Sequence, residues 1–165
     1  MRTLGLIAGA ALLLAACGGA PGNEPLTISG VNVEADLPSV GSPQAVAYWK
    51  NLSPDLETAI AAQFAGSIDP TGKTINVDVD ELSLASPFAA GATAQTAQLA
   101  GTVTLVNPDG TNAAVYNVTA TSADLVTYLP AGENIVTVAP TSAEYYRAIV
   151  QAFARGTADT LRAAT

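Results

Sequence analysis

The last quarter of the sequence carries the pattern that most restricts how this chain can fold. After Pro140, the run Thr141-Ser142-Ala143-Glu144 is typical of a capping box and predicts a helix that continues to about Leu161. At 100° per residue, the side chains of this helix separate into two groups. The apolar side comprises Tyr145, Ile149, Phe153, Gly156 and Thr160, and the polar side comprises Arg147, Gln151, Arg155, Asp159 and Arg162. A helix with one apolar side has to bury it against a second layer, which the rest of the chain must supply.

The second layer is predicted to be a β-sheet, because segments upstream of this helix alternate apolar and polar residues. Residues 26–33 predict a first strand with a bulge at Gly30. Residues 73–80 alternate strictly, and we expect this strand to continue through Leu82 and Leu84. Both segments are typical of strands that bury one face.

Further strands are predicted between these segments and the last helix. Residues 94–107 and 113–121 predict two strands joined by a tight turn at Asn107-Pro108-Asp109-Gly110. Residues 122–139 predict one more strand or two short ones. Consecutive strands of this kind favour an antiparallel or mixed sheet.

A second amphipathic helix is predicted between the first two strands. Ser53 can cap it, Pro54 suits its first turn, and Gly66 is expected to end it. The preceding residues 35–52 contain proline and glycine and predict an irregular connection. The sequence therefore predicts an α+β fold, with a four- to five-stranded antiparallel or mixed sheet and two amphipathic helices on one face of it.

The composition narrows the chemistry that such a fold could perform. The chain has 165 residues, no histidine and one cysteine. Without histidine it lacks the commonest general base and the commonest transition-metal ligand, so Ser-His-Asp and Cys-His arrangements are excluded. A single cysteine cannot form an internal disulfide. We therefore expect a protein that is not an enzyme, binds no metal or other cofactor, and is held together by packing.

The charge balance argues against nucleic acid as a partner. Fourteen acidic and six basic residues give the chain a net charge of −8 at pH 7. A protein this acidic repels phosphate backbones. We therefore expect no nucleic-acid partner.

The only cysteine lies near the N-terminus, at the end of an apolar run. Arg2 supplies a positive charge, residues 4–16 are apolar but too few to span a bilayer, and Cys17 follows. The run Leu14-Ala15-Ala16-Cys17 resembles the lipobox of bacterial lipoprotein precursors. That resemblance implies that signal peptidase recognises Leu14, Ala15 and Ala16, and that Cys17 carries acyl chains that anchor the protein to a membrane. The alternatives are an ordinary secretory signal and an N-terminal helix with a buried thiol.

This interpretation divides the chain into a signal peptide (1–16), a lipidated cysteine with a flexible tether (17–25) and a single α+β domain (26–165). An aspartate after the lipidated cysteine tends to retain lipoproteins of enteric bacteria in the inner membrane, and with Gly18 at that position the chain resembles lipoproteins sorted to the outer membrane. The expected location is therefore the periplasmic side of the envelope, at the outer membrane. The order of elements is similar to that of lipopolysaccharide-assembly lipoproteins and other small accessory lipoproteins of the envelope. The resemblance implies a non-enzymatic accessory or binding role with an envelope protein as partner.

Carboxylates are the first candidates for a surface site. Asp78 and Asp80 are expected on the same face of their strand, roughly 6.5–7 Å apart. With Glu34 or Glu133 they could bind calcium, or act as acid and base in glycan hydrolysis. The simpler interpretation is the solvated face of a half-buried strand.

Arginines are the second candidates. Arg147, Arg155 and Arg162 on the last helix could contact anionic lipid head groups or lipopolysaccharide phosphates. The simpler interpretation is a water-facing surface. Two alternatives to an accessory role therefore stay open: a carboxylate-based glycan hydrolase or calcium-dependent binder, and a lipid- or lipopolysaccharide-binding lipoprotein with an apolar cavity beneath its helices.

Overall fold

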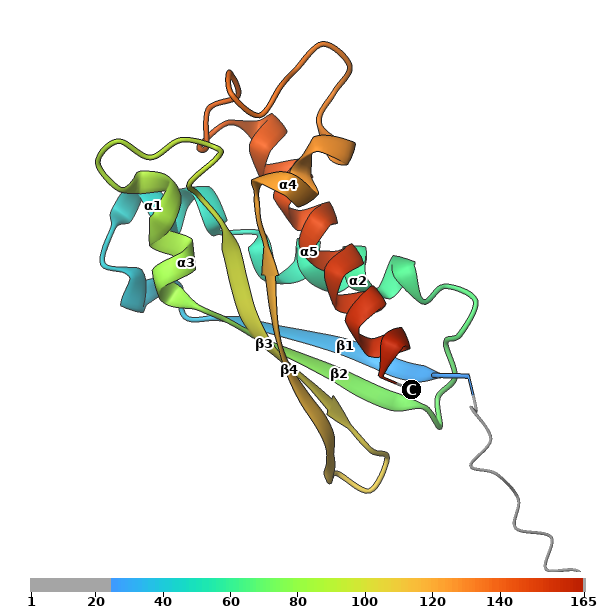
Figure 1. Cartoon of the computed structure of the whole chain (residues 1–165). Helices are drawn as coiled ribbons and strands as arrows, with labels where there is room; N and C mark the ends of the chain where they lie inside the picture. The colour runs from blue at the N-terminus through green and yellow to red at the C-terminus, as the bar shows by residue number, and fades with distance from the viewer. Residues whose placement is uncertain (1–24, 165) are drawn as a thin grey trace, which may run out of the picture.

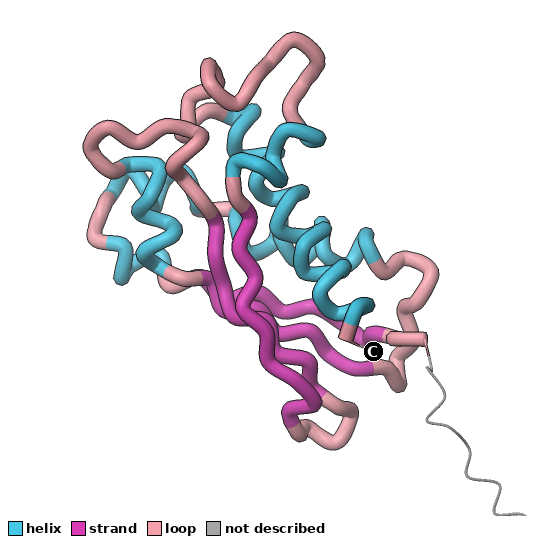
Figure 2. Tube along the Cα trace, viewed as in Figure 1, coloured by secondary structure: helices cyan, strands magenta, loops and turns pink. Residues whose placement is uncertain are grey.

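A four-stranded sheet forms one layer of the protein, and the two long helices lie together on one of its faces (Figures 1 and 2). The structure, a computed structural model, describes residues 25–164, so Cys17 and the three residues before it lie outside the described residues. The strands follow one another across the sheet in the order β1 (Ile28–Ala35), β2 (Lys73–Val79), β3 (Leu99–Val106) and β4 (Asn112–Ala120). β1 and β2 are parallel, and the other two pairings are antiparallel. The predicted α+β fold with a mixed sheet is confirmed.

The helix layer consists mainly of α2 (Leu52–Gln63) and α5 (Ala143–Ala163). α2 contacts β1, α5 contacts β3 and β4, and the two helices contact each other. Because α2 lies in the connection between β1 and β2, it supplies the crossover that a parallel pair of strands requires. The prediction of two helices on one face of the sheet is therefore correct.

The core lies between these two layers. Leu56 and Ile60 of α2, Phe153 of α5, and Ile75 and Val103 of the sheet are all fully buried. The alternation of the strands and the periodicity of the helices thus bury the faces that the sequence predicted.

Gly101 in β3 is needed because the backbone of the neighbouring strand β2 lies close to it. A Cβ atom at this position would lie 2.7 Å from the backbone oxygen of Asp78 and 3.4 Å from Cζ of Phe153. A separation below 3.0 Å from a backbone atom is shorter than real Cβ contacts allow, so only glycine fits here without a shift of β2.

Several short helices occupy segments that the sequence assigned to other structures. They are η1 (Leu37–Val40), α1 (Pro43–Trp49), α3 (Glu81–Ala85), η2 (Ser86–Phe88), α4 (Ser122–Leu125) and η3 (Val126–Tyr128). The prediction of an irregular connection over residues 35–52 is wrong, because α1 forms there. Ser42 caps this helix by accepting a hydrogen bond from the Ala45 amide at 3.3 Å, and Pro43 begins it.

The extension of β2 through Leu82 and Leu84 is also wrong. The strand ends at Val79 and Asp80 caps α3, so that Leu84 is buried while Leu82 is 82% exposed. The fifth strand predicted over residues 122–139 is absent from the described part of the chain. There a capping box between Thr121 and Asp124 starts α4.

The ends of the long helices differ from the prediction by one to three residues. α2 begins at Leu52 and ends at Gln63, before Gly66. α5 is capped by Ser142, which accepts from the Tyr145 amide at 3.1 Å, and not by Thr141. The predicted irregularity near Gly30 and the turn at residues 107–110 are both confirmed, since the β1–β2 register shifts at Gly30 and Gly110 has φ of 84°.

Candidate functional site

The face of the sheet opposite α2 and α5 carries mostly small polar side chains. Pairing brings them side by side in rows across the strands: Asn32, Asn76, Thr104 and Val115 in one row, and Glu34, Asp78, Thr102 and Asn117 in the next. Three side-chain hydrogen bonds join neighbouring strands, from Asn32 Nδ2 to Asn76 Oδ1 (2.9 Å), between Ser29 and Thr74 (3.1 Å), and from Thr102 to Asn117 Oδ1 (3.3 Å). We call this surface the polar sheet face.

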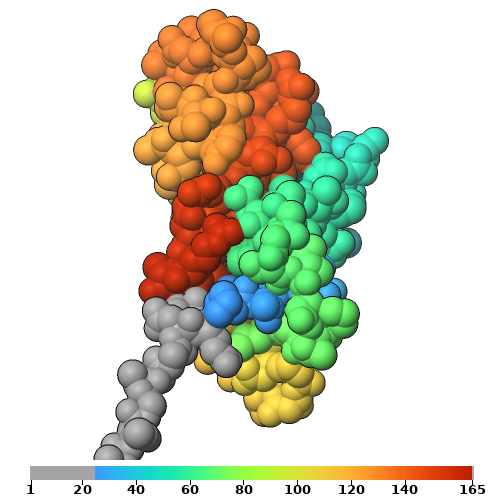
Figure 3. Space-filling model, turned by 90° about the vertical axis from the view of Figure 1, so that its right-hand side faces the viewer, coloured from blue at the N-terminus to red at the C-terminus, as the bar shows by residue number. Residues whose placement is uncertain are grey.

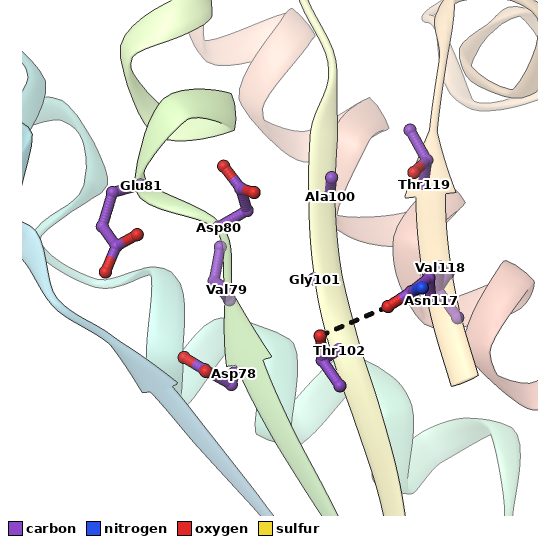
Figure 4. Close-up of a pocket in the computed structure, with 10 residues that line it drawn as sticks. All are labelled: Asp78, Val79, Asp80, Glu81, Ala100, Gly101, Thr102, Asn117, Val118 and Thr119. Carbon is purple, nitrogen blue, oxygen red and sulfur yellow. Dashed lines mark hydrogen bonds between the residues drawn. The ribbon is translucent and has the colours of Figure 1, made fainter. Parts of the chain in front are cut away.

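A shallow hollow lies on this face where β2 ends (Figure 4). Asp78, Asp80 and Glu81 lie on one side of it, and Asn117 and Thr119 of β4 lie on the other. Its middle is formed by residues 100–102 of β3, of which Ala100 and Gly101 have little or no side chain. The hollow is therefore polar, open to solvent and acidic on one side.

The two aspartates that the sequence analysis paired do not converge in this hollow. The carboxylate of Asp80 accepts a hydrogen bond from the Ser83 amide at 3.0 Å and caps α3. Asp78 is exposed, and its carboxylate points away from that of Asp80 (Figure 4). Asp80 therefore has a structural role, and this geometry gives no support to an acid–base pair for glycan cleavage.

The proposed third carboxylates do not complete a site either. Glu34 is the pairing partner of Asp78 on β1, whereas Glu133 lies in the connection between η3 and α5 and does not line the hollow. Within residues 25–164, no group of three or more acidic or cysteine side chains is placed to hold a metal ion. The described residues thus offer a calcium ion no ready-made set of ligands.

The three candidate arginines lie on α5, in the helix layer, and each has a polar partner. Arg147 pairs with Glu144 at 3.4 Å, and Arg155 and Arg162 both pair with Asp159, at 2.8 and 3.8 Å. The hydrogen bond to Asp159 raises the pKa of Arg155. Arg162 also donates to the backbone oxygen of Gln63 and lies over the ring of Phe64, 5.0 Å from its centre. Arg162 therefore joins the ends of α2 and α5, and the structure does not bring these arginines together with Asp78 or Asp80.

A surface groove runs between α2 and α5, on the side that Figure 3 shows with α5 in red. Ala59, Ala62 and Val150 form its apolar floor, and Asp55, Arg147 and Gln151 line its rim. Tyr146 also lines the groove and donates a hydrogen bond to Asp55 Oδ2 at 2.6 Å, which joins the two helices. Partial burial, together with this hydrogen bond, raises the pKa of Tyr146 strongly.

An aromatic cluster lies at the start of α5; the pair Tyr48-Trp49 is expected from the sequence to pack at the edge of the core, but its contacts with Phe88 and Tyr146 are not. Tyr48 makes edge-on contacts with Trp49, Phe88 and Tyr146 at centroid distances of 4.6–5.6 Å. Trp49, the only tryptophan, is fully buried and donates to the backbone oxygen of Leu84 at 2.8 Å. The cue in the sequence was Ser42-Pro43, which starts the helix that carries Tyr48 and Trp49.

The apolar space beneath the helices is filled by side chains. Leu56, Ile60, Ile149 and Phe153 have no exposed surface. The alternative of a lipid- or lipopolysaccharide-binding lipoprotein requires an apolar cavity at this place. The packing of the described core gives that alternative no support.

Comparison with known proteins adds no relative. No family model, no curated protein and no solved structure matches this chain. Among the described residues, no helix has the length and apolar character needed to cross a bilayer.

Proposed function

We propose that this protein is a lipoprotein of the bacterial cell envelope, anchored through acyl chains on Cys17, and that its folded part is a non-enzymatic accessory or binding module. The observation that carries the proposal is the run Leu14-Ala15-Ala16-Cys17 after an apolar segment and a basic N-terminus. Such an anchor holds because each buried methylene contributes about 0.8 kcal/mol, and two or three acyl chains together resist release.

The position of the anchor limits how far the domain can stand from the membrane. Pro25 follows Cys17 by eight residues, which span at most roughly 26–29 Å when fully extended. Pro25 leads directly into β1, whose N-terminal end lies near the C-terminal end of α5 (Figure 1). We therefore expect this end of the domain to face the bilayer at the outer membrane, on the periplasmic side.

The polar sheet face supports the binding part of the proposal. It is a broad surface over which no helix of residues 25–164 lies, and apart from Val115 its exposed side chains are small or polar. Surfaces of this kind can form hydrogen bonds with another protein without a large apolar patch that would cause aggregation. An envelope protein is the expected partner.

Metabolic labelling with a palmitate analogue tests the anchor. The chain should be labelled and recovered with membranes, whereas the Cys17→Ser variant should be unlabelled and recovered in the soluble periplasmic fraction. Gly18→Asp serves as a matched variant, since it keeps the thiol and should keep the label while moving the protein toward the inner membrane. An unlabelled, freely dissolved wild-type chain would contradict the proposal.

Cross-linking in the envelope tests the binding role. A photoreactive side chain at Asn76, in the middle of the polar sheet face, should capture an envelope protein. The same group at Gln151, on α5, serves as the control position. Equal capture from both positions, or none from Asn76, would contradict docking on this face.

A further inference from the structure

The two edges of the sheet differ in how their backbone groups are used. At the β1 edge, the Val33 amide donates to Glu57 Oε1 at 3.1 Å. The Ile28 amide donates to the Ser67 oxygen and the Asp69 amide donates to the Ile28 oxygen, both at 2.9 Å. The register shift at Gly30 adds a further irregularity. This edge is therefore closed by a loop, a side chain and a bulge, which are devices that prevent strand pairing.

The β4 edge has one of these devices among the described residues, a shift in its register with β3 opposite Leu105 and Val106, and from Ala114 to Ala120 it pairs with β3 without interruption. β4 is nine residues long, and its sequence, NAAVYNVTA, contains no charge and no proline. It is also rich in residues that favour strands, and Val115 near its centre is 56% exposed. A long, uncharged edge strand is a template for pairing with another strand.

The pairing pattern shows which groups of β4 point outward. The Ala100 oxygen accepts from the Asp80 amide, so Ala100 and every second residue of β3 face β2, and the intervening residues face β4. Those intervening residues pair with positions 114, 116, 118 and 120. The backbone groups of Val115, Asn117 and Thr119 therefore point away from the sheet, and no other described segment bonds to them.

We propose that β4 is a docking edge for β4 of a second copy of this chain, antiparallel about a twofold axis, so that two sheets join into one of eight strands. The lack of charge on β4 favours a second copy as the occupant. Two chains of net charge −8 repel each other over most of their surfaces, but self-pairing of this strand places no like charges opposite one another.

The pairing also closes upon itself. Each copy uses its one open edge, and the covered β1 edges at both ends of the joined sheet cannot add a further chain, so association stops at two. This inference does not depend on lipidation, and it goes beyond the proposed function.

A register centred on Tyr116 uses the outward groups of Val115 and Asn117. It pairs Val115 of each copy with Asn117 of the other copy, and it allows about four backbone hydrogen bonds. The two Tyr116 rings, each half-buried in the single chain, would meet on the helix face of the joined sheet. The exposed Val115 side chain would be covered by the neighbouring Asn117.

Sedimentation equilibrium of the full chain in density-matched detergent tests the proposal. The wild-type chain should form dimers, and Val115→Lys should weaken the dimer at least tenfold, because it places a like charge from each copy at the paired edge. Thr104→Lys is the matched control, since Thr104 is paired with Val115 on the same face but lies on β3, which is bonded on both sides. That variant should dimerise like the wild type.

Amide hydrogen exchange locates the contact. Amides of Val115 and Asn117 should gain protection as the protein concentration rises, and those of β1 should not. If Val115→Lys lowers the buried-type emission of Trp49 and so reports misfolding, Asn117→Lys replaces it. The proposal would be overturned if the wild-type chain stays monomeric, or if the wild type and both edge variants, Val115→Lys and Asn117→Lys, dimerise with equal affinity. So would protection of β4 that arises only when a different envelope protein is added, because it would assign the edge to that protein.

Discussion

Gly101→Ala should destabilise the protein, because the added methyl group has no room between β2 and β3. Its Cβ would lie 2.7 Å from the Asp78 backbone oxygen, and Gly101 is not among the glycines with positive φ, so the cost is steric and not conformational. Overpacking a close-packed site costs about 1–3 kcal/mol. Since a loss of about 2 kcal/mol moves a urea midpoint by roughly 1 M, urea titration followed by Trp49 emission will resolve it.

A double-mutant cycle with Phe153→Leu separates the two possible clashes. The same Cβ would lie 3.4 Å from Phe153 Cζ, which is a contact that a small shift of the ring relieves. If the backbone of Asp78 sets the cost, the two losses should add to within about 0.5 kcal/mol. Gly30→Ala is the control, because its Cβ would meet nothing within 4 Å, and its effect should be small or slightly stabilising. Recovery of stability in the Gly101→Ala, Phe153→Leu double variant would refute the reasoning.

Two further predictions concern the cap of α3 and the buried tyrosines. Asp80→Ala should lower the free energy of unfolding in urea by about 1 kcal/mol, because it removes the cap to the Ser83 amide. Asp80→Asn can still cap, and Asp78→Ala changes an exposed carboxylate, so each of these variants should change stability by less than about 0.5 kcal/mol. Equal losses for Asp80→Ala and Asp80→Asn would contradict the capping role. Burial raises the pKa of Tyr48, Tyr145 and Tyr146 above the ordinary value of 10.0. Their contribution to stability is therefore complete below pH 10 and should be lost as the pH rises further. Thermal unfolding measured from pH 8 to 11 tests this, and a melting temperature that is constant over that range would contradict it.

The sheet and its two long helices could be predicted because their signals are local and repeated. Residues 73–80 alternate over a whole strand, and Tyr145, Ile149 and Phe153 recur along one side of α5. The side of α5 that is buried is wider than predicted, since Val150 and Ala154 are also buried against neighbouring elements. That result depends on the elements that surround the helix, which periodicity alone does not give.

The short helices could not be predicted in the same way. α3 and α4 are five and four residues long, well below the length at which a helix is stable without tertiary contacts. Their capping residues were readable, since Asp80 precedes α3 and Thr121 and Asp124 frame the start of α4, but apolar residues nearby fitted a strand equally well. For this reason the sequence predicts a surface site at Asp80, although this residue caps a helix. The parallel pairing of β1 with β2 is a separate case, since the sequence does not distinguish an antiparallel from a mixed sheet.

The hydrogen bonds that cross the polar sheet face join uncharged groups: Ser29 with Thr74, Asn32 with Asn76, and Thr102 with Asn117. None of these side chains titrates near neutral pH, and bonds between neutral groups are little affected by ionic strength. These three hydrogen bonds should therefore persist at high and at low salt, and in mild acid and in mild alkali. The rows of side chains that these bonds join would then keep their arrangement across the strands through such changes of salt and pH.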